Sequence, residues 1–314
     1  MRTIILFIAC LCLSAGVRAD QQQELPREIV ANGVEFILVP GGWFWHTLSE
    51  IDPKTGNALN KGSRELKVWV DTYYIGKYEA RARDLERFMN SGASRYATQY
   101  GPQPELEGGD GESKGCSVRR EPGGKYYQLF PEKDLPATHL SWDIANEWSQ
   151  WMGFRLPTDA EWVRAFRGDD KRIYPWGDDY PDDTFAGFQE GGTVCNVRPV
   201  TMFPKGRSPY GVYNMAGNVY EYVADWYNVV YLNQLQDGAR NPFSTEPHLL
   251  FGFSKPLRML RGARWASGAT ELMIYSNRDY RATDESFACY GTRFALDVAK
   301  VRAMLDSGAA TVVH

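Results

Sequence analysis

The feature of this chain that most constrains its fold is an abundance of aromatic side chains in a sequence with few regular helix or strand patterns. Phenylalanine, tryptophan and tyrosine make up 14% of its 314 residues. Such large rings supply enough apolar area for a core even where regular secondary structure is sparse. Beyond Gly168 the sequence consists mostly of turn residues and short aromatic segments. We therefore expect one large domain of irregular α+β structure over residues 20–314.

Two helices are clearly predicted in the middle of the chain. Ile144, Trp148 and Trp151 recur at helical spacing, and Gly153 can end that segment. The next helix begins with the capping box of residues 158–161, Thr-Asp-Ala-Glu, in which the first and last side chains satisfy each other's backbone donors. Earlier in the chain, short aromatic and β-branched runs predict strands at 34–39, 43–45 and 68–75, and residues 84–89 predict a helix.

The N-terminus has the pattern of a secretory signal. Arg2 precedes an apolar run over residues 4–13, and small residues lead up to Ala19. This order is typical of a signal peptide that is cleaved after Ala19, although a buried N-terminal helix is the alternative. The apolar run is too short for a permanent membrane span, and no other segment is long enough. We therefore expect an exported protein without a membrane span.

The charge balance argues against two classes of partner. Cleavage after Ala19 would leave 33 Lys and Arg against 39 Asp and Glu, so the net charge would change from −4 to −6. A mildly acidic protein has no electrostatic reason to bind nucleic acid or an anionic membrane. We expect neither as a partner.

Three cysteines would remain in the exported chain: Cys116, Cys195 and Cys289. In an oxidising compartment they predict one disulfide and one leftover thiol. Cys116 and Cys195 both lie in loop-like segments with glycine nearby, so we expect these two to form the disulfide.

Several motifs along the chain together resemble one known family. They are Val39-Pro40-Gly41-Gly42, Phe154 to Trp162, Tyr174 to Asp178, Ser208 to Glu221, Leu260 to Trp265, and Gly291 to Ala295. In order and content, over residues 34–296, they resemble the formylglycine-generating, sulfatase-modifying enzyme family. The resemblance implies a compact α+β domain with little regular secondary structure, remotely similar to C-type lectins, and it implies bound calcium.

One calcium site of that family uses the segment that matches residues 214–221. The resemblance assigns the ligands here to four residues: Asn214, Gly217, Val219 and Glu221. Calcium takes several oxygen ligands at once, so an oxygen-rich turn suits it. The alternative is that Asn214 and Glu221 only tie the turn together by hydrogen bonds. A second family calcium site is matched only at Asn196-Val197 and lacks the expected Asp, so we do not assign it.

The family's copper chemistry is not expected here. Formylglycine-generating enzymes bind copper through two cysteines that follow an Arg-Gly-Gly-Ser motif, and soft thiolates suit Cu(I). In this chain the motif reads Arg-Gly-Ala-Arg over residues 261–264, and the positions that match the cysteines lie near Ser267 and Leu272, neither of which is a cysteine. No cysteine lies between Cys195 and Cys289 to replace them. The four histidines are widely separated, so the histidine iron site of related sulfur–carbon bond-forming enzymes is not expected either.

Polar and aromatic residues near these motifs are candidates for lining an altered cleft: Arg264, Trp265, Ser267, Arg278, Tyr280 and Arg281. The alternative for Arg278 and Arg281 is a structural ion pair with Asp279, Asp284 or Glu285.

Two functions remain open at this point. The first is a non-catalytic binding protein of the periplasm that recognises an envelope protein. This resembles the TagR proteins, which act upstream of the Thr-phosphorylation switch of bacterial type VI secretion. The second is a periplasmic oxidase of a small molecule, because another exported branch of the family acts on a precursor of the siderophore pyoverdine. The resemblance implies structural calcium for either function.

Overall fold

The fold is built from two main sheets. The computed structural model describes residues 24–51, 58–97, 100, 117–189, 196–272 and 278–313. The first sheet is antiparallel throughout. Its strands, in spatial order, are β12 (Ala295–Asp297), β5 (Tyr73–Gly76), β2 (Val34–Val39), β1 (Glu28–Ala31) and β13 (Ala310–Val312). Strands from the two ends of the described chain therefore lie side by side in this sheet.

The second sheet brings the central motifs together. Its strands, in spatial order, are β10 (Arg278–Ala282), β9 (Leu257–Arg261), β8 (Tyr220–Trp226) and β11 (Tyr290–Thr292). Strand β11 runs parallel to β8, whereas the other pairs are antiparallel. Two hairpins complete the strands: β3 (Gly42–Ile51) with β4 (Ala58–Val70), and β6 (Val118–Arg120) with β7 (Tyr126–Gln128).

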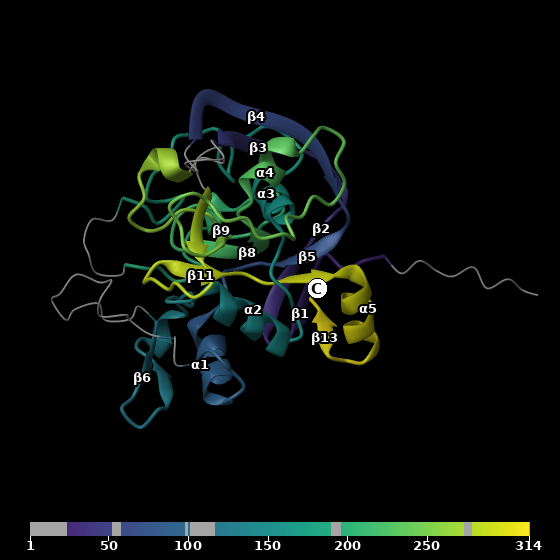
Figure 1. Ribbon diagram of the computed structural model, residues 1–314. Coiled ribbons are helices and arrows are strands. Elements are labelled where there is room, and N and C mark those ends of the chain that lie inside the picture. The colour runs from purple at the N-terminus through teal and green to yellow at the C-terminus, as the bar shows by residue number, and fades with distance from the viewer. Residues whose placement is uncertain are drawn as a thin grey trace, which may run out of the picture.

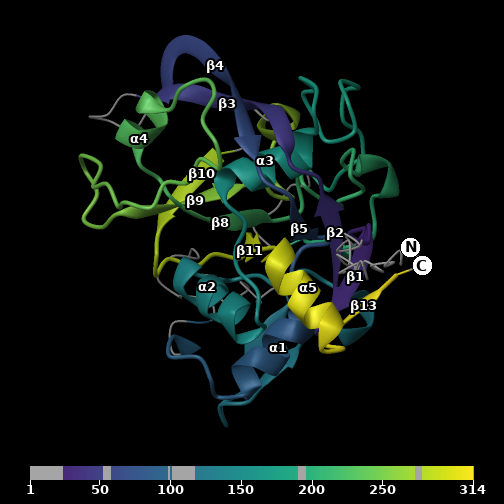
Figure 2. The ribbon, with the colours of Figure 1, turned by 90° about the vertical axis from the view of Figure 1, so that its right-hand side faces the viewer.

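The α-helices of the described residues are α1 (Ala82–Asn90), α2 (Trp142–Trp151), α3 (Asp159–Arg167), α4 (Val229–Gln234) and α5 (Val298–Asp306). Helices α2 and α3 contact strand β8 of the second sheet, whereas α5 contacts β12 and β13 of the first sheet. Figures 1 and 2 show α3 and the β3–β4 hairpin on one side of β8 and β9, and α2 and α1 on the other side. The long irregular connections between these elements confirm the expected α+β fold with low regular secondary structure.

The local signals for the two central helices are confirmed. In the capping box of α3, the Thr158 side chain accepts from the Glu161 backbone and the Glu161 side chain accepts from the Thr158 backbone. Helix α2 begins after Ser141, whose side chain accepts from the Ile144 backbone, and the chain turns at Gly153 with a φ of +80°. The helix expected at 84–89 lies within α1.

The strand expected over residues 68–75 is wrong in one respect, because the structure divides it between β4 and β5. The break falls at Asp71 and Thr72. There the Thr72 hydroxyl accepts from the Gly41 backbone, and a side-chain carbon on Gly41 would lie 2.8 Å from the Thr72 nitrogen. This close crossing of two backbones requires glycine at position 41 and turns the chain from the hairpin into the first sheet.

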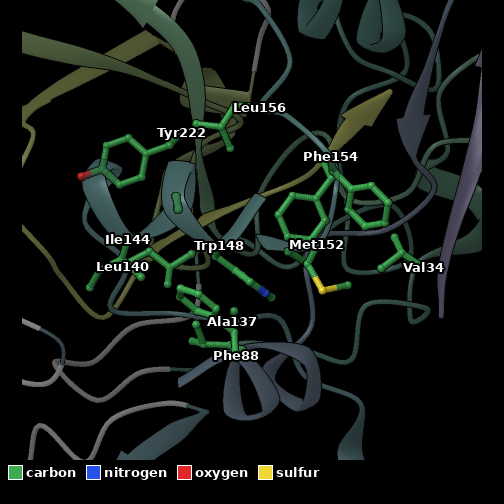
Figure 3. Close-up of a cluster of buried hydrophobic side chains, with 14 of the residues drawn as sticks. Val34, Phe88, Ala137, Leu140, Ile144, Trp148, Met152, Phe154, Leu156 and Tyr222 are labelled. Atoms are coloured by element: carbon green, nitrogen blue, oxygen red, sulfur yellow. The ribbon is translucent and has the colours of Figure 1, made fainter. Parts of the chain in front are cut away.

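Two hydrophobic clusters fill the space on either side of the second sheet. One contains α3 and the inward face of the β3–β4 hairpin, with Trp162 and Phe166 fully buried. The other lies between α1, α2 and the first sheet. Figure 3 shows members of this cluster, among them Phe88 from α1 and Trp148 from α2, whose stacked rings have centroids 6.5 Å apart. Because each large ring removes on the order of 150–250 Å² from water, these clusters can stabilise a fold with few long helices.

Candidate functional site

Successive side chains of strand β10 face opposite sides of the sheet, so they separate some of the residues predicted to line the cleft. Arg278 and Tyr280 share one face of this strand, and Arg281 lies on the other. Tyr280 stacks on Tyr227 with ring centroids 4.4 Å apart, and Arg278 lies 3.2 Å from Asp159. The six proposed residues therefore do not line a single wall.

Arg264 and Ser267 lie together at the start of the loop that follows β9. The Arg264 nitrogen donates to the Ser267 hydroxyl at 3.2 Å, and the Ser267 nitrogen donates back to the Arg264 carbonyl at 3.0 Å. Trp265 is buried, and its backbone nitrogen donates to the Asn218 carbonyl at 2.9 Å. Within the altered motif, Ala263 has a φ of +62°. The left-handed conformation suits the glycine of the family motif better than this alanine.

Cys289 lies beside this loop. Its sulfur is 3.9 Å from the Arg264 Nη1 atom, and the residue is only 6% exposed. Burial raises the pKa of the Cys289 thiol to about 11, although Arg264 and Arg281 oppose that shift. At neutral pH this sulfur is therefore a protonated thiol rather than a thiolate. We refer to Arg264, Ser267 and Cys289 as the arginine–thiol cleft, a name taken from the cleft that the family resemblance implies; the Ser267 and Cys289 side chains are buried there.

Arg281 forms the structural ion pair that sequence left as the alternative. Its Nη1 atom lies 2.7 Å from the Asp279 carboxylate and 2.6 Å from the Tyr280 carbonyl. Its guanidinium also lies over the Tyr290 ring, 5.3 Å from the ring centroid. These contacts occupy Arg281 and hold it against the second hydrophobic cluster.

A buried charge cluster around Asp159 was not found from the sequence. Arg261 Nε lies 2.5 Å from one oxygen of this carboxylate, while Arg278 and His46 each approach the other oxygen to 3.2 Å. Burial opposes ionisation, yet the two arginines hold the pKa of Asp159 well below its usual value. Burial also lowers the pKa of His46, with Asp159 opposing. The sequence signal was only Asp159 at the start of a predicted helix.

The segment assigned to calcium folds around a second buried centre. Both Glu221 oxygens accept from Arg293, and Trp162 Nε1 also donates to one of them at 2.7 Å. Gly217 has a φ of +85°, and a side-chain carbon there would lie 2.4 Å from the Gly187 carbonyl oxygen. Only glycine fits this crossing. Val219 is fully buried in the same turn.

Asn214 bonds to a different carboxylate, that of Glu79. Its Nδ2 atom donates to Glu79 at 2.7 Å and to the Val200 carbonyl at 3.0 Å. Asn218 also donates to Glu79, at 2.9 Å. The Asn214 Oδ1 atom is buried without a hydrogen-bond partner among the described residues. Burial, together with the charge of Glu221, raises the pKa of Glu79 to about 8. Sequence reasoning missed both Glu79 and Asn218.

These oxygens fit calcium in part. Asn214 Oδ1 and the buried Glu79 carboxylate are hard oxygen donors of the kind calcium prefers. Glu221 fits less well, because Arg293 and Trp162 already occupy its two oxygens. Within the described residues, no group of three or more His, Cys, Asp and Glu side chains is arranged to hold a metal. The turn can therefore accept calcium only through amide and backbone oxygens beside one carboxylate.

Some of the sequence predictions lie outside the described residues. They are the signal peptide over residues 1–19 and both members of the expected disulfide, Cys116 and Cys195. The described helices include none that is both long enough and apolar enough to cross a membrane.

The two-sheet α+β fold defines a domain of the formylglycine-generating type. So does its buried centre, in which Glu221 and Arg293 come from two of the sequence motifs. The model of the sulfatase-modifying factor enzyme 1-like domain matches residues 21–298, and the chain belongs to this family.

Three comparisons show the range of proteins that the chain is similar to. It is 29% identical over 225 residues to the mouse formylglycine-generating enzyme, covering 62% of this chain and 59% of that protein. It is 31% identical over 159 residues to the inactive C-alpha-formylglycine-generating enzyme 2 of cattle, covering 48% of this chain and 45% of that protein. The chain thus spans about half to three fifths of these relatives. Among solved structures, PvdO from Pseudomonas aeruginosa aligns with a TM-score of 0.57 at 20% identity, covering 88% of this chain and 100% of PvdO.

Proposed function

We propose that this chain is a non-catalytic recognition protein that binds an envelope protein through the arginine–thiol cleft. The observation that carries the proposal is that the two positions matching the family's copper-binding cysteines hold other, buried residues, Ser267 and Leu272. Ser267 is buried, and its hydroxyl accepts from the Arg264 backbone. Leu272 is fully buried in the first hydrophobic cluster. Neither side chain supplies the soft thiolate that Cu(I) prefers.

The remaining sulfur is poorly suited to replace that pair. Nucleophilic and metal-binding cysteines act as thiolates, and their pKa is lowered by a favourable environment. The pKa of Cys289 is instead raised to about 11 by burial. Arg264 places a positive charge beside this neutral thiol, which favours recognition of an acidic or hydrogen-bonding group over oxidation chemistry.

The biological setting of the proposal comes from the sequence. A signal-like N-terminus supports export to the periplasm, and the missing cysteine pair supports a regulator similar to the TagR proteins. We therefore place the protein in the regulation of type VI secretion, through a periplasmic partner. The similarity to a relative that is named inactive agrees with a non-catalytic role.

A periplasmic oxidase of a small molecule is the second candidate. The observation that favours it is the contact of the Tyr220 phenol with Ser267, which is bonded to Arg264, while the Arg264 guanidinium lies beside the Cys289 thiol. The Tyr220 nitrogen donates to the Cys289 carbonyl at 2.8 Å, and burial raises the pKa of the Tyr220 phenol to about 12. Such a polar, largely buried group of side chains could orient a siderophore precursor for reaction with oxygen.

For either function, we propose that calcium binds the turn at residues 214–221 and stabilises it. Asn214 and the neighbouring backbone carbonyls would hold it, with Glu79 as the nearby carboxylate. When bound, calcium would supply positive charge to a buried region that now contains two carboxylates, Glu79 and Glu221.

The test is capture of partners from the protein's own cell envelope by the tagged full chain, followed by mass spectrometry. The wild type is compared with Arg264→Ala and with Arg120→Ala, which removes an exposed arginine from the β6–β7 hairpin. We expect a stoichiometric envelope protein that the wild type and Arg120→Ala retain and that Arg264→Ala loses.

Oxygen consumption with a pyoverdine-type precursor distinguishes the second candidate. Turnover by the wild type that is lost in Arg264→Ala and kept in Arg120→Ala would replace the recognition proposal with the oxidase. Capture of the same envelope protein by all three forms would place its binding site outside the arginine–thiol cleft.

A further inference from the structure

A groove rich in positive charge runs along the molecule between the start of β1 and the loop at residues 204–211. Two cavities of about 600 and 260 Å³ share Arg27, Arg207 and Gly211 in their walls, so they form one continuous groove. We name it the basic groove. Lys205 lies at one end, and Lys77 lies at the other.

The charge of the basic groove is opposite in sign to that of the whole chain. Arg27, Lys205 and Arg207 are exposed, and within the described residues none of them forms an ion pair. Lys77 is paired with Glu28 at 2.6 Å, and Glu28 is the one acid in the groove walls. The groove therefore carries an excess of three positive charges in a chain of net charge −4. Such a local field attracts a negatively charged partner and raises its association rate.

The backbone around the groove is held rigidly. The Arg207 Nε atom donates to the Pro204 carbonyl at 2.7 Å, and its guanidinium lies over the Tyr213 ring, 5.6 Å from the centroid. A side-chain carbon on Gly206 would lie 1.8 Å from the Phe185 carbonyl oxygen, so this loop packs directly on Phe185. Because the loop and the Arg207 side chain are already ordered, little conformational entropy is lost when a ligand binds.

We propose that the basic groove binds an extended acidic peptide segment of a partner protein. The unpaired cations are spread along connected cavities, and this arrangement matches carboxylates spaced along an extended chain. A single phosphate would instead need several donors converging on one point. Apolar surface from Phe185 at one end and Val313 at the other can contact the peptide between its charges.

This inference shares with the proposed function only the assumption that the partner is a protein. Arg264, Ser267 and Cys289 are absent from the walls of the basic groove. Binding at the groove and binding at the arginine–thiol cleft can therefore succeed or fail separately.

The experiment measures binding of a fluorescent octaglutamate peptide to the purified full chain by anisotropy at two salt concentrations. The double variant Arg27→Glu/Arg207→Glu is compared with Arg120→Glu, a charge reversal at an exposed arginine outside the groove. We expect saturable binding by the wild type and by Arg120→Glu, and affinity weaker by roughly tenfold or more in the double variant. Circular dichroism and thermal unfolding show whether each variant keeps its fold.

Three results would overturn the inference. They are no saturable binding by the wild type, equal weakening in Arg120→Glu and the double variant, or full displacement of the peptide by millimolar inorganic phosphate. The last result would assign the groove to a small anion. Because the cleft variant Arg264→Ala leaves the groove intact, its peptide binding should equal that of the wild type. Loss of envelope partners in Arg264→Ala would therefore not be mistaken for failure of the groove.

Discussion

The carboxylate of Glu221 and the guanidinium of Arg293 form a two-pronged ion pair that is completely buried. Both N–O distances are 2.6 Å, and both side chains are 0% exposed. Arg293 also donates to the carbonyls of Gly76 and Tyr213, and Trp162 donates to Glu221. One arginine thus joins the end of β5 in the first sheet to strand β8 and, through Glu221, to helix α3.

Removal of Arg293 should destabilise the fold strongly. Arg293→Met would leave the Glu221 charge buried without a partner, so we expect the free energy of unfolding to fall by about 3–5 kcal/mol. Urea unfolding followed by tryptophan fluorescence measures this change. The matched variant Arg95→Met removes an arginine that is 77% exposed and paired with Glu147, and should have little effect because exposed pairs contribute little. Similar losses in both variants would contradict the central role of Arg293.

Calcium should raise the melting temperature of the metal-free protein, because a ligand that binds only the folded state stabilises it. Asn214→Ala removes the unpartnered Oδ1 oxygen and should abolish that rise. Asn90→Ala removes an amide that bonds to the Tyr126 backbone instead, and should keep it. Differential scanning calorimetry with calcium, magnesium and EDTA measures the effect. An unchanged calcium response in Asn214→Ala would show that Asn214 does not bind calcium. The alternative, that it only ties the turn together by hydrogen bonds, would then hold.

Glu79 should make stability depend on pH in a defined direction. Its pKa is raised from 4.5 to about 8 in the folded state, so between these values the folded protein holds a proton that the unfolded chain has released. Stability from this group is therefore greatest below pH 4.5 and declines as the pH rises toward 8. Glu79→Gln cannot titrate, so its free energy of unfolding should fall less than that of the wild type across this range. Parallel profiles for the two proteins, measured by urea unfolding, would refute the assignment.

Calcium bound near Glu79 should also change that profile. A cation favours the ionised carboxylate and lowers its pKa. Saturating calcium should therefore flatten the pH dependence of the wild type and leave that of Glu79→Gln nearly unchanged.

Cys289 should remain a free thiol that reacts slowly in the folded protein. It is buried, and its pKa is raised to about 11, so little thiolate forms at neutral pH. Iodoacetamide labelling followed by peptide mapping should modify Cys289 rapidly only after denaturation. The same non-reducing map tests the expected Cys116–Cys195 disulfide. A disulfide that includes Cys289 would contradict both expectations.

Local sequence patterns were sufficient for the central helices. The Thr158–Glu161 capping box and the spacing of Ile144 and Trp148 depend on neighbours a few residues apart, so they predict α3 and α2 without knowledge of the fold. The motif order then identified the family, because spaced motifs retain information about the whole domain.

The buried centres could not be predicted in the same way. Asp159 meets Arg261 and Arg278 across more than a hundred residues, and Glu79 meets Asn214 across 135. The local sequence around each of these residues does not indicate a partner so far away along the chain. The sequence also did not show which of the possible cleft residues share a face: Tyr280 and Arg281 are adjacent in sequence, and in a strand adjacent side chains face opposite ways.

The pairing of β1 with β13 has a consequence for the time at which the molecule can finish folding. Ile29 lies opposite Val312, so the first strand of the sheet receives its outer neighbour only from the far end of the chain. During synthesis, or passage through a channel with the N-terminus leading, β1 can pair with β13 only after residues 310–312 have emerged. Its open edge is meanwhile available to other chains, which makes a chaperone or rapid delivery valuable at that stage. The strand that covers this edge, β13, lies beyond residue 298, where the family match ends.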